Sequence, residues 1–515
     1  MLRRSSFLRA AGAAGAVVLA APAGAGARTL RGAPRVAIVG AGIAGLSAAL
    51  ALRDRGVRAT VYEAQHRIGG RMHSEPAFWG NGQVSEYGGE LIDSDHTTMQ
   101  ALAKRYGLTL TDVLAGVPAN AQQTIFEHGA YYPERRLFQD FRPVYRTLAA
   151  QVAAAGYTTT YDRSTAAGRE LDAMSLATWI ERFVPGGRRS NVGAYIELQY
   201  VAEYGISPEE QSSLNMIYWL GRQPQYNETT GEFVALGPSD ERYHILGGNQ
   251  QLPRAIAAHI GDEHLLLGHR LEAIARRPDG RVTLTFRTAD GIVVETVDKA
   301  IVAIPFTTLR NVDLRDAHFD ARKLAAIREL GYGNHSKLIV QFDERFWHRH
   351  GPWPGIGSGD LTYDGPFIQT WEATRGQAGR TGMLVDFAAA SGNDWLHPAA
   401  PYTTSLTPGT AGYAETFVDQ LDRVMPGAKR HFTGKAALSC MKDDPYAFGS
   451  YSGWLKGQYT RIAGYERVRQ GNVLFAGEHC SVILQGFMEG AAREGIRAAH
   501  DVLRDAGIPL AGSAA

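Results

Sequence analysis

Short apolar runs in this chain predict buried β-strands. Residues 36–39, 299–305 and 472–476 are rich in Val, Ile and Ala, a pattern typical of parallel strands covered on both faces. Amphipathic residues 97–107 and the segment 251–259 predict helices. Strands and helices that alternate along the chain indicate an α/β fold.

Further helices are predicted at residues 176–183 and 486–503, and the aromatic-rich stretch 195–219 reads as helical too. Residues 281–286 and 292–297 are strand-like, and Asp290-Gly291 between them predicts a two-residue hairpin turn.

Residues 337–342 alternate polar and apolar, which places Lys337, Ile339 and Gln341 on one face of a half-buried strand. The Gly/Pro-rich residues 351–359 predict a surface loop.

The first apolar run leads into Gly40-x-Gly42-x-x-Gly45, which opens a helix rich in Ala and Leu. Glycines at these positions permit a tight turn, close approach of a pyrophosphate to backbone N–H groups, and close packing of helix on strand. The diphosphate then lies at the positive end of the helix. Glu63 ends the second strand. A carboxylate at this place can accept hydrogen bonds from ribose hydroxyls, and it disfavours the 2′-phosphate of NADP.

The motif continues in Arg67-Ile68-Gly69-Gly70-Arg71, whose glycines let the backbone pass close to a ligand and whose Arg71 can pair with a phosphate. On these residues the chain resembles FAD-dependent oxidases of the flavin amine oxidase family, which includes monoamine, polyamine and L-amino acid oxidases. The resemblance implies FAD rather than NAD. It also implies an α/β fold, in which a Rossmann-type FAD-binding domain of discontinuous segments carries an inserted mixed α+β substrate domain.

The two predicted domains interleave along the chain. The FAD-binding domain takes residues 34–95, 241–320 and 436–507, and the substrate domain takes residues 96–240 and 321–435. A length of 515 residues suits two domains.

Three side chains receive catalytic roles from the resemblance. Lys337 would hold a water against flavin N5, and Phe346-Trp347 follows it at the family's spacing. Tyr451 and Phe487 would face each other across the amine as aromatic walls. The alternatives are a lysine that points to solvent and two aromatics that belong to the core.

The resemblance also implies a cofactor site built from all three FAD-binding segments. The backbone near Leu271 would contact adenine, and Glu478 would hydrogen-bond the flavin ribityl chain. A serine, Ser450, stands where animal monoamine oxidases attach FAD through a cysteine, so we expect non-covalent FAD. The predicted cofactor-binding residues are Gly40, Gly42, Ile43, Ala44, Gly45, Glu63, Ala64, Gly70, Arg71, Gly88, Gly89, Glu90, Leu271, Glu478, Gly486, Phe487 and Met488.

The run Asp93-Ser94-Asp95-His96 superficially suggests a metal cluster. We favour an N-cap for the helix that begins near Thr97, because Asp and Ser are preferred there, and we predict no metal site. Polyamine-oxidase relatives carry an acid where Asp93 aligns, which leaves an amine-attracting role open.

Net charge and cysteine content limit which partners, disulfides and metal sites we expect for the chain. A net charge of +1 without a long basic run gives no footprint for nucleic acid. Two cysteines, Cys440 and Cys480, form neither a disulfide framework nor a cysteine metal site; whether they pair, and whether the chain forms a homodimer, stay open.

Residues 1–27 resemble a bacterial export signal of the twin-arginine type, with Arg3-Arg4 before an uncharged run and two Ala-x-Ala sites. We therefore expect a periplasmic or secreted protein without stable membrane insertion after signal removal. A transmembrane anchor is the alternative, which the Ala/Gly-rich composition and Pro22 disfavour.

The predicted function is oxidation of a C–N bond: hydride passes from the substrate to flavin N5, the imine hydrolyses, and O₂ is reduced to H₂O₂. L-Amino acid oxidases of the family place an arginine just after the Gly-Gly turn, where Gly88-Gly89 is here followed by Glu90 and Asp93. Two acids predict a free amine as substrate. The alternatives are an L-amino acid oxidase with a carboxylate-binding arginine elsewhere, such as Arg222, a flavin desaturase or dehydrogenase, and a non-catalytic flavin-binding module.

Overall fold

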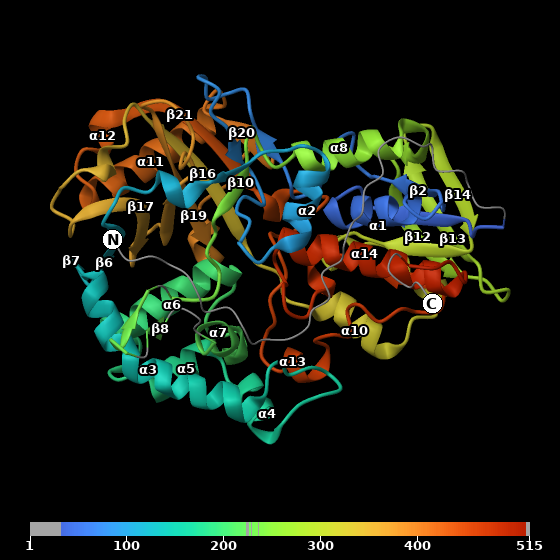
Figure 1. Cartoon of the computed structure of the whole chain (residues 1–515), viewed down its shortest axis with the longest axis horizontal. Coiled ribbons are helices and arrows are strands. Elements are labelled where there is room, and N and C mark those ends of the chain that lie inside the picture. Colours follow the sequence, from blue (N-terminus) through green and yellow to red (C-terminus); the bar gives the residue numbers. More distant parts are fainter. Residues whose placement is uncertain (1–31, 223–225, 228, 235, 511–515) are drawn as a thin grey trace.

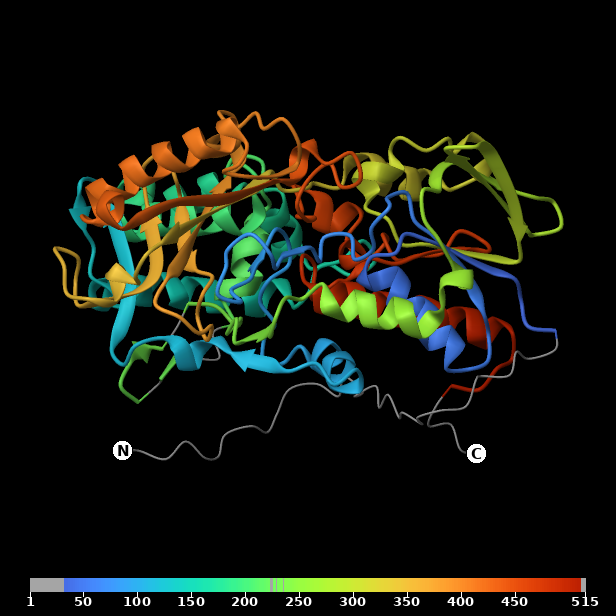
Figure 2. The same ribbon diagram turned by 90° about the horizontal axis from the view of Figure 1, so that it is seen from above.

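The computed structural model describes residues 32–222, 226–227, 229–234 and 236–510. The fold is α/β, as predicted, and two parts lie side by side along the long axis of the molecule (Figure 1 and Figure 2). The predicted export signal, residues 1–27, lies outside the described residues. Among those described, no helix combines the length and the apolar character needed to cross a membrane.

The first part is built on a five-stranded parallel sheet in the order β11-β2-β1-β15-β22. Val39 pairs with Val302, and Val302 pairs with Phe475. The carboxyl ends of strands from distant stretches of the chain therefore meet at one edge of the sheet. Ligands of open α/β sheets bind at such an edge. The strands are β1 (Val36–Val39), β2 (Ala59–Tyr62), β11 (Leu265–Leu266), β15 (Lys299–Val302) and β22 (Val473–Phe475).

Both faces of this sheet are covered, which explains the continuous apolar runs. On one face α1 (Ile43–Arg53) packs against α8 (Gln251–Ile260) and α14 (Met488–Asp505) (Figure 2). The contact between α1 and α14 requires glycine, because a Cβ at Gly495 would lie 2.0 Å from the carbonyl oxygen of Ala44.

An antiparallel meander covers the other face, where Phe286 stacks on Tyr62 of β2 at 4.3 Å between ring centroids. It comprises β12 (Arg270–Arg276), β13 (Val282–Thr288) and β14 (Gly291–Val297). The predicted hairpin is present, but Thr288 pairs with Gly291, so the turn residues are Ala289-Asp290, one position earlier than predicted.

The second part is built on an eight-stranded sheet in the order β20-β21-β16-β19-β18-β17-β6-β7. Strands β6 and β17 are parallel, and the other neighbours are antiparallel. Because β17 pairs with β6 from Ile356 onward, the predicted surface loop 351–359 was wrong in its second half. The strands are β6 (Ala121–Glu127), β7 (Ala130–Tyr131), β16 (His335–Phe342), β17 (Ile356–Tyr363), β18 (Gln369–Glu372), β19 (Gly382–Ala389), β20 (Tyr402–Thr404) and β21 (Phe432–Cys440).

Strand β16 has the predicted alternation but is buried on both faces. Leu338 packs in one cluster with Phe417 of α11 (Pro408–Val424), whereas Ile339 packs with Trp79 and Tyr87 of the first part. All eight residues of β16 are buried. The prediction of a half-buried strand was wrong because the two parts of the molecule close over this strand together.

Helices complete both parts of the molecule. The aromatic-rich stretch divides into α6 (Asn191–Tyr204) and α7 (Ser213–Leu220), and the predicted helix at 176–183 is α5 (Leu176–Phe183). The other helices are α2 (Thr97–Arg105), α3 (Glu134–Ala155), α4 (Ala166–Asp172), α9 (Phe306–Leu309), α10 (Ala321–Glu329), α12 (Ala428–His431) and α13 (Gln458–Arg461). Short strands are β3 (Ser74–Glu75), β4 (Ser85–Glu86), β5 (Leu110–Asp112), β8 (Tyr226–Asn227), β9 (Glu232–Phe233) and β10 (Tyr243–Ile245).

Candidate active site

A cavity of about 670 Å³ extends from the carboxyl edge of the parallel sheet to the large sheet. Every side chain or backbone segment that the sequence nominated for cofactor binding or catalysis borders it, except Gly45. A Cβ at Gly45 would lie 1.9 Å from the carbonyl oxygen of Gly40, so this glycine serves the packing of α1 on β1.

The turn between β1 and α1 forms one end of the cavity. Gly40 has φ 104°, and a Cβ there would lie 2.9 Å from the carbonyl oxygen of Ala303, so the tight turn needs glycine. Gly42 is the N-cap of α1, and no atom lies within 4 Å of the place a Cβ would take. The free N–H groups of a helix start attract anions, and Gly42, Ile43 and Ala44 at the start of this helix border the cavity.

Glu63 holds this turn in place from the end of β2. Its carboxylate accepts hydrogen bonds from the backbone N–H groups of Ala41 (2.7 Å) and Gln65 (2.9 Å). Burial raises the pKa of Glu63, and these donors oppose that rise. Whether the carboxylate also binds ribose hydroxyls stays a prediction.

Arg71 and Glu478 link three separate segments beside the cavity. Arg71 donates to the carbonyl oxygen of Ser450 (2.6 Å) and to Glu478 (2.9 Å). Glu478 also accepts from the Ser452 hydroxyl (2.7 Å) and from the backbone N–H of Gly486 (2.9 Å). Although burial opposes ionisation, the Arg71 guanidinium and these donors hold the pKa of Glu478 below its ordinary value. Since protein groups occupy both oxygens, its bond to a ribityl chain stays a prediction.

Several polar side chains at the cavity lack partners within the described protein, among them His479 and Gln485. His479 is 1% exposed, and neither of its ring nitrogens has a hydrogen-bond partner. The carboxamide atoms of Gln485 are likewise unpaired. Buried polar groups are normally hydrogen-bonded, so unpaired atoms beside a glycine-lined cavity fit a polar dinucleotide such as FAD.

Lys337 reaches the cavity from β16 as half of a buried ion pair. Its ammonium lies 2.5 Å from the Glu90 carboxylate and donates to the carbonyl oxygen of Gly88. The indole N–H of Trp371 donates to the other oxygen of Glu90 at 3.1 Å. Lys337 therefore does not point to solvent, and Glu90, already neutralised, is not free to attract an ammonium as predicted.

Tyr451 belongs to a stack of rings on one side of the cavity. His335 of β16 stacks on Tyr451 (4.8 Å between centroids) and on Phe387 (4.5 Å). The His335 ring also hydrogen-bonds the Ser450 hydroxyl (2.5 Å) and the carbonyl oxygen of Ala202 (2.7 Å). Burial lowers the pKa of His335 to about 4, so the ring is neutral. Nothing in the sequence pattern pointed to His335 or Phe387.

Phe487 has its own aromatic partners. Trp219 of α7 stacks on it with ring centroids 5.9 Å apart and planes 7° apart, and His96 makes an edge contact at 5.1 Å. A Cβ at Gly486 would lie 3.3 Å from the Tyr451 ring, so the two aromatic groups are neighbours. We call the space between Tyr451 and Phe487 the aromatic slot. The aromatic-rich stretch 195–219 was the only sequence signal for Trp219.

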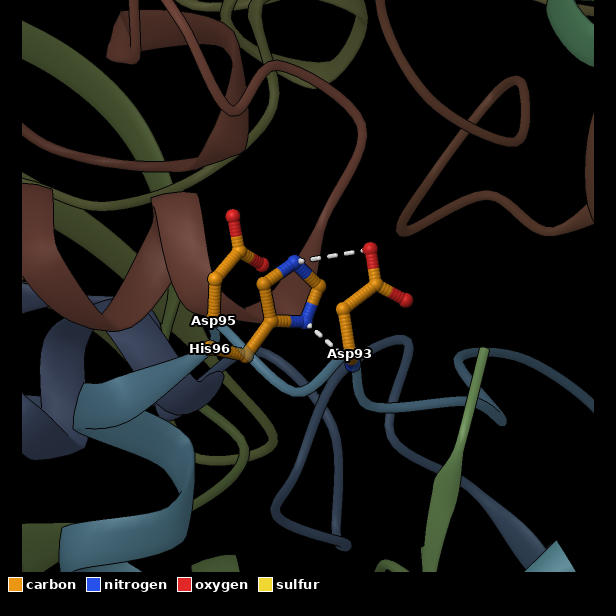
Figure 3. Close-up of side chains that lie close together, drawn as sticks. All are labelled: Asp93, Asp95 and His96. Atoms are coloured by element: carbon orange, nitrogen blue, oxygen red, sulfur yellow. Dashed lines mark hydrogen bonds and ion pairs between the residues drawn. The ribbon is translucent and has the colours of Figure 1, made fainter. Parts of the chain in front are cut away.

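Asp93, Asp95 and His96 do lie together, with potential ligand atoms within 4.8 Å of one another (Figure 3). However, Nδ1 of His96 accepts the backbone N–H of Asp93 (3.0 Å), and Nε2 faces the Asp93 carboxylate at 3.6 Å. A neutral imidazole has one acceptor nitrogen, which this hydrogen bond already uses. Asp93 also accepts from Ser239 (2.8 Å) and from the backbone N–H of Glu241 (3.0 Å). The geometry is that of a hydrogen-bonded cluster.

The predicted Asx-type cap of α2 was wrong. His96 is the N-cap residue and makes no side-chain cap bond. Instead the carboxylate of Glu489, at the start of α14, accepts from the backbone N–H groups of Thr98 (3.0 Å) and Met99 (2.8 Å). Asp93 does not cap α2, and it borders the cavity.

Further acids border the cavity and were missed from sequence, among them Glu203 and Glu241. Arg222, the residue considered for binding a substrate carboxylate, does not border it; its guanidinium lies over the Tyr157 ring at 3.9 Å. Cys440 and Cys480 are buried free thiols.

This geometry defines a dinucleotide-binding oxidoreductase whose cofactor cavity continues into an aromatic slot. The model of the flavin containing amine oxidoreductase family matches residues 43–503, and the chain belongs to that family. The resemblance inferred from the motifs is confirmed.

Individual relatives include both amino-acid and amine oxidases. An L-amino-acid oxidase of Siganus canaliculatus is 25% identical, over 91% of this chain and 85% of that protein. A putative L-amino-acid oxidase, YobN, of Bacillus subtilis is 26% identical, over 91% of this chain and 94% of that protein. The solved structure of cyclohexylamine oxidase from Brevibacterium oxydans IH-35A shares the fold with a TM-score of 0.77 and 21% identity, over 92% of this chain and all of that one.

Proposed function

We propose that this chain is an FAD-dependent oxidase of C–N bonds in amines, with non-covalent FAD and O₂ as the electron acceptor. When bound in this cavity, FAD would supply the hydride acceptor and the route by which the two electrons reach O₂ to yield H₂O₂. The substrate leaves as an imine, which water hydrolyses to a carbonyl compound and ammonia or an amine.

The residues around the cavity have distinct tasks in this proposal. Gly40 permits the tight turn, and Gly42 leaves room for the diphosphate at the start of α1. Tyr451 and Phe487 orient the amine between their rings. Lys337, held by Glu90, keeps a fixed positive charge and a bound water beside the reacting atoms, where negative charge on oxygen is stabilised.

The observation that carries the choice of an amine is the charge of the cavity. Asp93, Glu203 and Glu241 border it, and they repel a carboxylate and attract an ammonium. An arginine would be the natural partner of an amino acid carboxylate. The arginines that border the cavity are engaged elsewhere, Arg71 by Glu478, Arg67 by the carbonyl oxygen of Gly70 and Arg270 by Glu272. Arg222 does not border the cavity.

An L-amino acid oxidase is the second candidate, favoured by the names of the relatives from Siganus and Bacillus. Peroxide release from a series of primary amines, measured beside the L-amino acids with the same side chains, separates the two. We expect higher kcat/KM for the amines. Higher values for the amino acids would overturn the proposal, and turnover with an artificial acceptor but without peroxide would indicate a dehydrogenase.

Non-covalent binding is supported by Ser450, whose hydroxyl bonds His335 and cannot form a thioether. We also propose export by the twin-arginine route, on the strength of the paired arginines and Ala-x-Ala sites in residues 1–27. Fractionation of cells that express the whole chain, with and without replacement of Arg3 and Arg4 by Lys, tests it.

A further inference from the structure

Two carboxylates at the cavity have no partner in the described protein. Glu203 lies near the end of α6, and Glu241 follows Ser239 before β10. Both border the cavity, and neither carboxylate makes a hydrogen bond or an ion pair with a described residue. Glu203 is partly exposed and Glu241 is exposed, so a bound molecule can reach both. Glu90 and Glu478 at the same cavity are each held by a cation.

These two acids adjoin both walls of the aromatic slot. The Tyr451 hydroxyl donates to the main-chain carbonyl of Glu203. The backbone N–H of Glu241 donates to Asp93, whose neighbour His96 contacts the Phe487 ring. A molecule whose one end lies in the slot therefore has Glu203, Glu241 and Asp93 beside it.

No cation of the described protein is paired with Glu203 or Glu241 to balance the negative charge of these carboxylates. Burial, together with Asp93, raises the pKa of Glu203 to about 7, and burial, Asp93 and Glu203 raise that of Glu241 to about 8. Arg375 lowers the pKa of Glu241, but its effect is the smallest of those that act on this group. The Arg375 guanidinium is already paired with Asp360, at 2.6 Å. Neighbouring carboxylates without a counter-charge repel one another, and a bound cation removes this repulsion.

The reacting nitrogen cannot be that cation. Hydride leaves the carbon beside nitrogen only when the nitrogen lone pair is free to form the imine, so the amine in the slot must be neutral. The positive charge that balances the acids must then sit elsewhere on the substrate.

We propose that the substrate is a diamine or polyamine, and that Glu203 and Glu241 bind a second, protonated nitrogen while the first lies neutral in the aromatic slot. This inference rests on the proposed function. It names Glu203 and Glu241 as specificity-determining residues that contact the substrate away from the reacting carbon.

The test compares three substrates with the same straight carbon chain: the α,ω-diamine, the amino alcohol with a hydroxyl in place of the second amine, and the monoamine. Peroxide formation gives kcat/KM for each with the FAD-loaded wild type, Glu203→Gln, Glu241→Gln and the double variant. Glu170→Gln, whose side chain is 67% exposed on α4, is the matched control. Anaerobic rapid mixing with each compound follows flavin reduction, and the dependence of its rate on concentration gives an apparent Kd for binding apart from reoxidation.

We expect the wild type to prefer the diamine over the amino alcohol by about tenfold or more, in kcat/KM and in binding. That ratio should fall about tenfold in Glu203→Gln or Glu241→Gln, further in the double variant, and not in Glu170→Gln. An amino alcohol used as well as the diamine, or a ratio that the Gln variants leave unchanged, overturns the inference while amine oxidation stands. L-Amino acids oxidised with no amine turned over would overturn the proposed function as well.

Discussion

Replacing Lys337 by Met tests the ion pair on which the predicted catalytic lysine depends. The two side chains are 5% and 10% exposed, and Nζ of Lys337 lies 2.5 Å from the Glu90 carboxylate. Methionine is an unbranched side chain one atom shorter than lysine and carries no charge, so Glu90 remains buried with only the Trp371 N–H as a donor.

The expected magnitude follows from burial. Removing one partner of a buried pair costs about 3–5 kcal/mol, whereas replacing both partners by neutral groups of similar volume is often nearly neutral. Lys337→Met should therefore lose about 3–5 kcal/mol of unfolding free energy, and the double variant Lys337→Met/Glu90→Gln should recover most of that loss. Lys104→Met, at an exposed position of α2, should change it by no more than about 0.5 kcal/mol.

Two assays separate stability from catalysis. Denaturant unfolding at saturating FAD gives the four free energies of the double-mutant cycle. Rapid mixing follows reduction by substrate without oxygen and reoxidation by O₂ as separate steps, at FAD occupancies matched by absorbance. We expect Lys337→Met to slow turnover while FAD occupancy stays near full, and the double variant to stay slow although its stability recovers.

Two results would refute this reasoning. If the single variants lose less than about 1 kcal/mol each and their losses add, the pair is not a buried, coupled charge pair. If both half-reactions keep their wild-type rates, Lys337 has a structural role only.

Three other predictions concern Phe487 of the aromatic slot, the non-covalent binding of FAD, and the buried carboxyl group of Asp386. Phe487→Ala should lower kcat/KM for amines and cost about 1–3 kcal/mol of stability, from its contacts with Trp219 and His96; a large fall in melting temperature with normal turnover would assign Phe487 to the core alone. Acid precipitation should leave a yellow supernatant, and flavin retained in the pellet would contradict non-covalent binding. Burial raises the pKa of Asp386 from 3.8 to about 8, so the native state holds a proton that the unfolded chain releases and stability falls as pH rises across that interval. Asp386→Asn should flatten this fall by about 1.4 kcal/mol per pH unit, measured by denaturation at about pH 6 and about pH 7.5; equal slopes would show that Asp386 is ionised in the folded protein.

The sequence by itself determined the cofactor half of this protein. Gly40, Gly42 and Glu63 lie within one strand–turn–helix–strand unit, where spacing alone dictates which backbone atoms can approach a diphosphate. The wholly apolar runs likewise identified the parallel strands, because such strands are covered on both faces.

Only the tertiary structure decided which charged groups of the site are paired, because the residues that pair are remote from one another in the chain. Glu90 and Lys337 are 247 positions apart, and Glu489 caps α2 from 391 positions away. The alternation of β16 placed Lys337 on the correct face, but only the packing of the two parts shows that both faces are buried. Glu203 and His335 show no local pattern, since long-range folding alone brings α6 and β16 to the same cavity.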